Sequence, residues 1–246
     1  MKKALMLVFL FCLPCSALAA MGNVVNYQLG NDAFEGYYIS PKEDAPLVVL
    51  LHDWDGLTDY EIQRARMLAD MGYAVFAADL FGAGVRPTEV KDKRQHTGEL
   101  YKDRARMRAL VQAAVDTAKA QGGKVENAVV MGYCFGGAAV LEYARSGADM
   151  KGFATFHGGL NTPEGQDYSK ARGEYLIMHG SADTNITMDQ FASLTEQLEK
   201  AGLKHEMISY GGAPHAFTVF GEDRYREDAD RKSWQSFSAF LAAVLK

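Results

Sequence analysis

Three residues far apart in the chain have the types that covalent hydrolysis requires. Cys134 lies in the segment Gly-Tyr-Cys-Phe-Gly-Gly, Asp183 follows His-Gly-Ser-Ala, and His215 follows Gly-Gly-Ala-Pro. A thiol can attack a carbonyl, an imidazole can take its proton, and a carboxylate can hold the imidazole in the required tautomer. Taken alone, each has another interpretation: a buried thiol, a helix N-cap and a surface histidine. Together they predict a nucleophile, an orienting acid and a general base.

The surroundings of Cys134 are typical of a nucleophile elbow with a thiol in place of the usual hydroxyl. A buried β-type run, 129–131, breaks at a glycine-flanked turn, and a helix-compatible run follows. Small residues are needed there, so we expect Gly132, Gly136 and Gly137 to let the strand and the helix approach closely. The apex side chain would stand at a helix N-terminus, whose partial positive charge favours a thiolate.

Strand and helix patterns alternate along the chain. Strands are predicted at 24–29, 34–39, 47–51, 73–78, 125–131, 153–156, 175–178 and 206–210. Helices are predicted at 58–71, 99–120, 136–145, 188–200 and 229–245. We therefore expect an α/β fold with a mainly parallel sheet, helices on both faces and an antiparallel edge made by the first two strands. In the predicted helix 58–71, Ile62, Ala65, Leu68 and Ala69 are expected to share the buried side.

Reactive residues of such folds gather at the carboxyl ends of the strands, which is where all three candidates lie. The order nucleophile, acid, histidine is that of the α/β-hydrolases. The loop His52-Asp53-Trp54-Asp55-Gly56 follows an early strand, so we expect the backbone N–H groups of Trp54 and Phe135 to form the oxyanion hole. His52 is expected to support that loop, and the polar segment 82–98 is a candidate lid.

The first residues are typical of an export signal. Lys2 and Lys3 precede a short apolar run, and Ala17-Leu18-Ala19 forms a cleavage box. We therefore predict a signal peptide over 1–19, a mature protein in the periplasm or secreted, and no membrane association after cleavage. A retained anchor is the alternative, and Cys15 fits a lipoprotein signal poorly. Cleavage would leave Cys134 as the one cysteine of the mature chain.

The rest of the composition excludes some classes of protein. The net charge is −5, and residues 20–246 contain neither a basic stripe nor a paired-cysteine spacing, so neither nucleic-acid binding nor structural zinc is indicated. Residues 20–246 are long enough for one domain with a full core, and no repeat or linker divides them. We expect a monomer that acts on a small molecule.

From about Pro46 onward the chain resembles the dienelactone hydrolase family of α/β-hydrolases. The resemblance rests on the cysteine elbow at 132–137, on Asp79-Leu80-Phe81 at a strand end, and on the Asp183 and His215 loops. It implies hydrolysis of a cyclic enol-lactone or another small ester through a cysteine acyl-enzyme, with no cofactor and no metal. It also implies an accessory carboxylate beside the thiol, for which Asp53 is the matching residue, one methylene shorter than the family's Glu.

Two further departures concern the substrate. The family grips a substrate carboxylate with two arginines, and the matching positions here are Ala83 and Val219. Arg86 is near enough to substitute, although it could equally be a solvated loop charge. His157 follows a predicted strand and is a candidate pocket residue, or else a structural histidine. The hydrolytic chemistry is therefore expected to transfer better than the dienelactone substrate.

Three functions follow from these residues. The first is an exported thiol hydrolase of small carboxylic esters or lactones. The second is a thioesterase or acyltransferase, because an acyl-enzyme can be captured by other nucleophiles. The third is a binding protein without catalysis on the same fold, against which the complete set of three residues argues.

Overall fold

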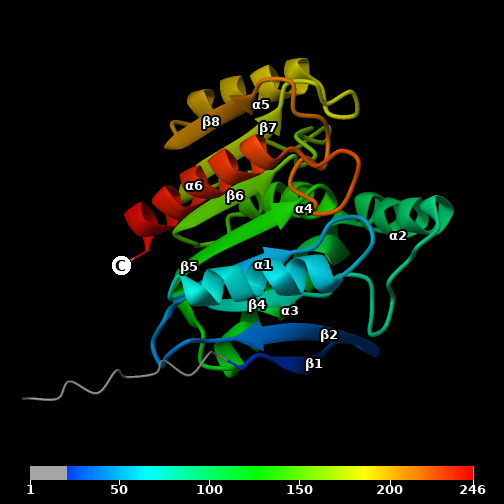
Figure 1. Ribbon diagram of the computed structural model, residues 1–246, viewed down its shortest axis with the longest axis vertical. Helices are drawn as coiled ribbons and strands as arrows, with labels where there is room; N and C mark the ends of the chain where they lie inside the picture. Colours follow the sequence, from blue (N-terminus) through cyan, green and yellow to red (C-terminus); the bar gives the residue numbers. More distant parts are fainter. Residues whose placement is uncertain (1–20, 246) are drawn as a thin grey trace, which may run out of the picture.

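The computed structural model describes residues 21–245, so the predicted signal peptide lies outside the described residues. Eight strands form one sheet there, in the order β1-β2-β4-β3-β5-β6-β7-β8 (Figure 1). Their bounds are β1 Asn23–Leu29, β2 Asp32–Ile39, β3 Pro46–Leu51, β4 Ala74–Ala78, β5 Lys124–Tyr133, β6 Gly152–Phe156, β7 Glu174–Gly180 and β8 His205–Tyr210. The pairs β1–β2 and β2–β4 are antiparallel and the others are parallel, which confirms the predicted fold class and its antiparallel edge.

Helices cover both faces of this sheet. Their bounds are α1 Asp59–Asp70, α2 Val90–Lys102, α3 Arg104–Ala120, α4 Phe135–Arg145, α5 Met188–Lys200 and α6 Glu227–Val244. In Figure 1, α1 and α6 lie across the front of the sheet, and α3 and α4 lie behind it. No helix within residues 21–245 is both long enough and apolar enough to cross a membrane.

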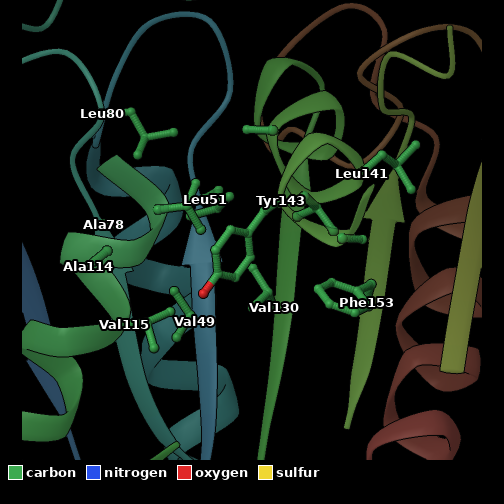
Figure 2. Packing of buried hydrophobic residues seen from close by; sticks show 14 of the residues in the cluster. Val49, Leu51, Ala78, Leu80, Ala114, Val115, Val130, Leu141, Tyr143 and Phe153 are labelled. Atoms are coloured by element: carbon green, nitrogen blue, oxygen red, sulfur yellow. The ribbon is translucent and has the colours of Figure 1, made fainter. Parts of the chain in front are cut away.

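The two faces of the sheet build two separate apolar cores. Along β3, Leu47, Val49 and Leu51 belong to the core shared with α3, α4 and α5, whereas Val48 and Leu50 belong to the core shared with α1 and α6. Figure 2 shows the first core, in which Tyr143 of α4 lies among side chains from the sheet and from α3. A continuous aliphatic strand such as β3 is therefore buried on both faces, as its composition predicts.

One predicted helix is wrong. The segment 99–120 is not a single helix, because α2 ends at Lys102 and α3 begins at Arg104. Asp103 between them accepts a hydrogen bond from the Arg106 backbone N–H (2.9 Å) and so caps α3. The candidate lid 82–98 is also only partly a loop, since α2 occupies its second half.

The buried face of α1 differs from the predicted one as well. Thr58 and Glu61 form a capping box that starts the helix, and Glu61 is itself buried. Arg64 is buried one turn later, whereas Ile62 is only half-buried. Two ionisable side chains of α1 thus enter the interior.

Candidate active site

The turn that carries Cys134 is strained and tightly enclosed. Cys134 has φ +48° and ψ −110° and directly precedes α4. Its backbone N–H donates to Phe156 (3.1 Å), and its carbonyl accepts from Gly159 (3.2 Å). A Cβ added at Gly136 would lie 2.4 Å from the Leu51 carbonyl oxygen, so only glycine fits there. Strain of this kind is typical of a nucleophile elbow and persists because neighbouring backbone fixes it.

The three candidate residues meet at the carboxyl ends of β5, β7 and β8. The Nε2 atom of His215 lies 3.0 Å from the Cys134 Sγ atom, and its Nδ1 lies 2.7 Å from the Asp183 Oδ2 atom. The Asp183 side chain is fully buried, His215 is 12% exposed, and Cys134 is half-buried. The sequence-based grouping of these three residues therefore agrees with the geometry, and Cys134 is not fully enclosed.

The electrostatics place the proton on the imidazole. Burial lowers the pKa of His215, but hydrogen bonds to Asp183 and Cys134 outweigh it and raise that pKa to about 10. Burial raises the pKa of Asp183, but His215 and the backbone N–H groups of Asn185 (2.8 Å) and Ile186 (2.9 Å) bring it below its usual range. The arrangement thus favours an imidazolium beside the Asp183 carboxylate.

The two predicted oxyanion donors belong to the first residue of α4 and to the loop after β3. Phe135 is the first residue of α4, where a backbone N–H has no acceptor inside the helix. In the loop after β3, Asp53 N–H donates to Glu61 (3.4 Å) and Asp55 N–H to Asp53 (3.1 Å). Within residues 21–245, the intervening Trp54 N–H has no protein acceptor. Their assignment as the oxyanion hole stays a prediction.

His52 holds that loop in place, as expected. Its Nδ1–H donates to the Asp53 carbonyl (2.6 Å), and its Nε2 accepts from the Leu80 backbone N–H (3.0 Å). Burial lowers the pKa of His52, which keeps the ring neutral and leaves one nitrogen free to accept.

Asp53 belongs to a group of three carboxyls beside the thiol. Oxygen atoms of Asp53, Asp55 and Glu61 all lie within 4.8 Å of one another. Burial, the Asp55 hydrogen bond and the charges of Glu61 and Cys134 raise the pKa of Asp53 well above its usual value. Glu61 already accepts from the backbone N–H and hydroxyl of Thr58. Burial therefore favours a shared proton among these carboxyls and the neutral form of Asp53.

Comparison with known proteins agrees with this geometry. A profile described as "Dienelactone hydrolase family" matches residues 34–245. The chain belongs to the dienelactone hydrolase family. A "Putative carboxymethylenebutenolidase" of Salmonella typhimurium strain LT2 is 23% identical, over 93% of this chain and 89% of that protein. The solved structure m3DLH is 31% identical and covers 93% of this chain and all of its own, with a TM-score of 0.87.

A second solved structure is similar over the same part of the chain. It is a dienelactone hydrolase-like promiscuous phosphotriesterase, P91, from metagenomic libraries. It is 28% identical to this chain, covers 93% of it and all of its own chain, and has a TM-score of 0.86. The likeness therefore extends over nearly the whole described sheet and its helices.

The two predicted substrate-binding residues of this dienelactone hydrolase family member, Arg86 and His157, are held by contacts inside the fold. Arg86 donates to the carbonyls of Leu57 and Val85 and to Glu35 (3.1 Å), so its donors tie the loop after β4 to the rest of the fold. His157 is fully buried behind the His215 ring. These contacts favour the structural interpretation of both residues.

The sequence analysis missed a side chain that borders the nucleophile. Tyr101 of α2 lies with its ring 5.5 Å from that of Phe135 and is 38% exposed. Burial of its hydroxyl end and the charge of Cys134 raise the pKa of Tyr101. No local signal marks this residue, because the predicted helix 99–120 places Tyr101 in its first turn and away from any predicted site residue. Two open surface hollows of about 630 and 500 Å³ flank α3 instead, and none of the three candidate residues lines either one.

Proposed function

We propose that this protein is an exported thiol hydrolase of small carboxylic esters or lactones, with Cys134 as nucleophile, His215 as acid and base, and Asp183 as its orienting carboxylate. The observation that carries the proposal is the pair of contacts at His215, 3.0 Å to the sulfur and 2.7 Å to the carboxylate. Membership of the dienelactone hydrolase family supports ester chemistry. Export rests on the sequence of residues 1–19 alone and stays a prediction.

The first half of the reaction forms a thioester. The Cys134 thiolate attacks the carbonyl carbon, a C–S bond forms, and the carbonyl π electrons move to its oxygen. Backbone N–H groups of Phe135 and Trp54 would stabilise that oxyanion. The tetrahedral intermediate then collapses, the C–O bond to the leaving alcohol breaks, and His215 Nε2–H protonates the departing alkoxide. In a lactone the alcohol stays attached to the acyl chain.

The second half returns the enzyme to its starting state. Neutral His215 takes a proton from water, and the hydroxide attacks the thioester carbon. The C–S bond breaks, the acid leaves, and the thiolate and imidazolium form again. Asp183 keeps the Nδ1 proton in place throughout, so that Nε2 always faces the reacting atoms.

The substrate of this chain need not carry a carboxylate. Ala83 and Val219 occupy the positions where the resemblance implies arginines, and neither can form a bidentate ion pair. Arg86 is engaged by carbonyls and by Glu35. The side of the site near Phe135 is instead aromatic, with Tyr101 and Phe81 within 5.6 Å of its ring. We propose neutral esters or lactones with a flat apolar part.

The likeness to P91 favours a second candidate, cleavage of a phosphotriester. The same thiolate would attack phosphorus, an S–P bond would form, and the aryloxide would leave with the proton of His215. Water would then release the phosphodiester. This activity uses the same three residues, so an aryl phosphotriester is a second probe in the experiment below.

The experiment measures hydrolysis of a short p-nitrophenyl ester, of a small lactone and of an aryl phosphotriester by residues 20–246. Cys134→Ala is expected to lower turnover of each accepted substrate at least about 10³-fold, because removal of one member disables the unit. The mature chain has one thiol, so one equivalent of iodoacetamide should inactivate the protein in the same proportion. Undiminished turnover by Cys134→Ala would overturn the proposal. Transfer of the acyl group to an alcohol or amine, seen by mass spectrometry, would favour the acyltransferase alternative.

A further inference from the structure

His215 lies in a long stretch without regular secondary structure. Residues 211–226 connect β8 to α6, and within this segment no helix or strand lies on either side of His215. Two hydrogen bonds, from Ala182 N–H to the Ala213 carbonyl (3.0 Å) and from Gly212 N–H to the Ser181 hydroxyl (2.8 Å), tie the start of the loop to the Asp183 side. A loop of this length moves easily unless side chains fix it, so the position of the imidazole depends on what anchors residues 216–220.

Arg64 of α1 supplies such an anchor from the interior. Its guanidinium is 1% exposed, donates to the Thr218 carbonyl (2.8 Å), and pairs with Asp230 of α6 (2.5 Å). The Phe220 ring lies against it at 4.2 Å. One side chain therefore joins α1, the His215 loop and α6.

The Thr218 hydroxyl extends this anchor to the imidazole. It lies 2.7 Å from the Tyr60 hydroxyl and 2.8 Å from the Nε2 atom of His157, and the Arg64 Nε–H donates to Tyr60 (3.3 Å). Because the guanidinium only donates, Tyr60 can donate onward to Thr218, and Thr218 to His157. His157 in turn packs edge to face against His215, with ring centroids 5.3 Å apart.

The two neighbouring imidazoles carry different charges. Burial, His215 and Arg64 lower the pKa of His157 well below its usual value, so His157 stays neutral beside the protonated His215. The ionisable groups that act on this pair and on the sulfur are Asp183, Cys134, His157, His179, Arg64, Asp53 and Tyr101. Two adjacent cations would repel each other, whereas a neutral ring supports the imidazolium sterically.

We propose that Arg64, Tyr60 and Thr218 act through His157 as positioning residues that hold His215 against Cys134. We call these four residues and Asp230 the Arg64 cluster. A buried ion pair seldom adds net stability over apolar residues of similar size. We therefore attribute the Arg64–Asp230 ion pair to the geometry that it imposes on residues 216–220 and not to a gain in stability. The inference rests on the proposed function in naming His215, but it concerns the contact between sulfur and imidazole, which can be measured without a substrate.

The experiment follows alkylation of Cys134 by iodoacetamide as a function of pH. Thr218→Val removes the hydroxyl but keeps the carbonyl that Arg64 binds. We expect the midpoint of its alkylation profile to rise by about one pH unit, because a displaced imidazolium stabilises the thiolate less. In the ester assay kcat should fall about tenfold or more, with KM within about twofold. Thr218→Ser should restore both, and Tyr60→Phe should shift the midpoint by less.

Two matched controls lie in the core on the opposite face of the sheet, which Tyr175 helps to form. Thr155→Val and Tyr175→Phe each remove a buried hydroxyl that has no protein partner within residues 21–245. They should leave the midpoint where it is. If the profiles of Thr218→Val and Tyr60→Phe superimpose on those of the controls while only thermal stability falls, the cluster is merely structural and the proposal is overturned. Tyr60→Phe decides the matter alone if Thr218→Val does not fold. A shifted midpoint in a protein that hydrolyses no ester would refute the proposed function and leave the positioning intact.

Discussion

Two buried arginine–carboxylate networks support this protein, and they lie at different distances from the chemistry. The Arg64 cluster reaches the ring of His215 through Thr218 and His157. The second network, which we call the Glu142 network, joins α4 to α3 and to the segment after β6. Glu142 accepts from Arg145 (2.9 Å), Arg104 (3.0 Å), Arg108 and Gln166 (3.0 Å).

The difference between them is one of position rather than of chemistry. Glu142 lies eight residues beyond Cys134 on α4, about 12 Å along the helix axis. Its partners Arg104 and Arg108 are 24% and 35% exposed, so both can turn toward water, whereas Arg64 is 1% exposed. The Glu142 network should therefore hold two helices together, and the Arg64 cluster should hold a reacting group.

The largest effect in this comparison is expected at Asp183, where positioning is most direct. Asp183→Asn keeps an acceptor for the backbone N–H groups of Asn185 and Ile186 but no longer stabilises the imidazolium. The kcat of the ester assay should fall about 10³- to 10⁴-fold, because the imidazole loses its tautomer and its charge partner. Steady-state kinetics on a p-nitrophenyl ester would check this value.

Asp167→Asn is a matched control for that variant. Asp167 also accepts a backbone hydrogen bond from two residues ahead, Ser169 (2.9 Å), but it lies on the surface away from the sheet edge. Its kcat should match wild type. A loss of less than tenfold in Asp183→Asn would show that His215 does not depend on this carboxylate.

The same contrast explains which features the sequence could predict. Cys134, Asp183 and His215 each follow a strand and carry a local turn signature, so their meeting follows from the parallel sheet alone. Arg64 and Asp230 carry no such signature, because charged residues in amphipathic helices usually face water. They meet only because α1 and α6 pack on the same face of the sheet, 166 positions apart in sequence.

The helix boundary at Asp103 was hidden for a related reason. Helical periodicity continues through 99–120, and the break depends on one side chain that caps α3 instead of continuing α2. A capping residue inside a periodic pattern is a weak local signal. The sequence therefore predicted the elements and the three candidate residues better than it predicted the groups behind them.

A smaller effect, on stability and not on rate, is expected at Glu142. Glu142→Gln leaves Arg145, which is 3% exposed, without a charged partner, although Tyr168 (2.9 Å) and Gln166 (2.8 Å) still accept from it. We expect a loss of about 2 kcal/mol in the free energy of unfolding, below the usual cost of breaking a buried pair. Urea unfolding at pH 7 would measure it, with kcat within twofold of wild type.

Asp228→Asn is the surface counterpart of that variant. It removes a carboxylate that pairs with Arg231 and Lys232 on α6, both more than half exposed. Exposed pairs contribute little, so the urea midpoint of Asp228→Asn should coincide with that of wild type. If Glu142→Gln instead lowers kcat as strongly as Thr218→Val does, the distinction between the two networks is wrong.

The last effect is expected at Glu61, a buried carboxylate that has no arginine partner among the described residues. It therefore shows what burial does to a carboxyl group in this protein when the arginines of Glu142 are absent. Arginine contacts outweigh burial and lower the pKa of Glu142, whereas burial outweighs the Thr58 hydrogen bonds and raises that of Glu61 to about 7. A carboxyl group whose pKa is lower in the folded than in the unfolded state adds stability that is lost as the pH falls. A carboxyl group whose pKa is higher in the folded state adds stability that is lost as the pH rises from about 4.5 to about 7. Between pH 5 and pH 8, wild type should therefore lose more unfolding free energy than Glu61→Gln, which keeps an oxygen for Thr58. Urea unfolding at both pH values would test this, and parallel losses in the two proteins would mean that Glu61 is ionised throughout and that the carboxyls beside Cys134 do not share a proton.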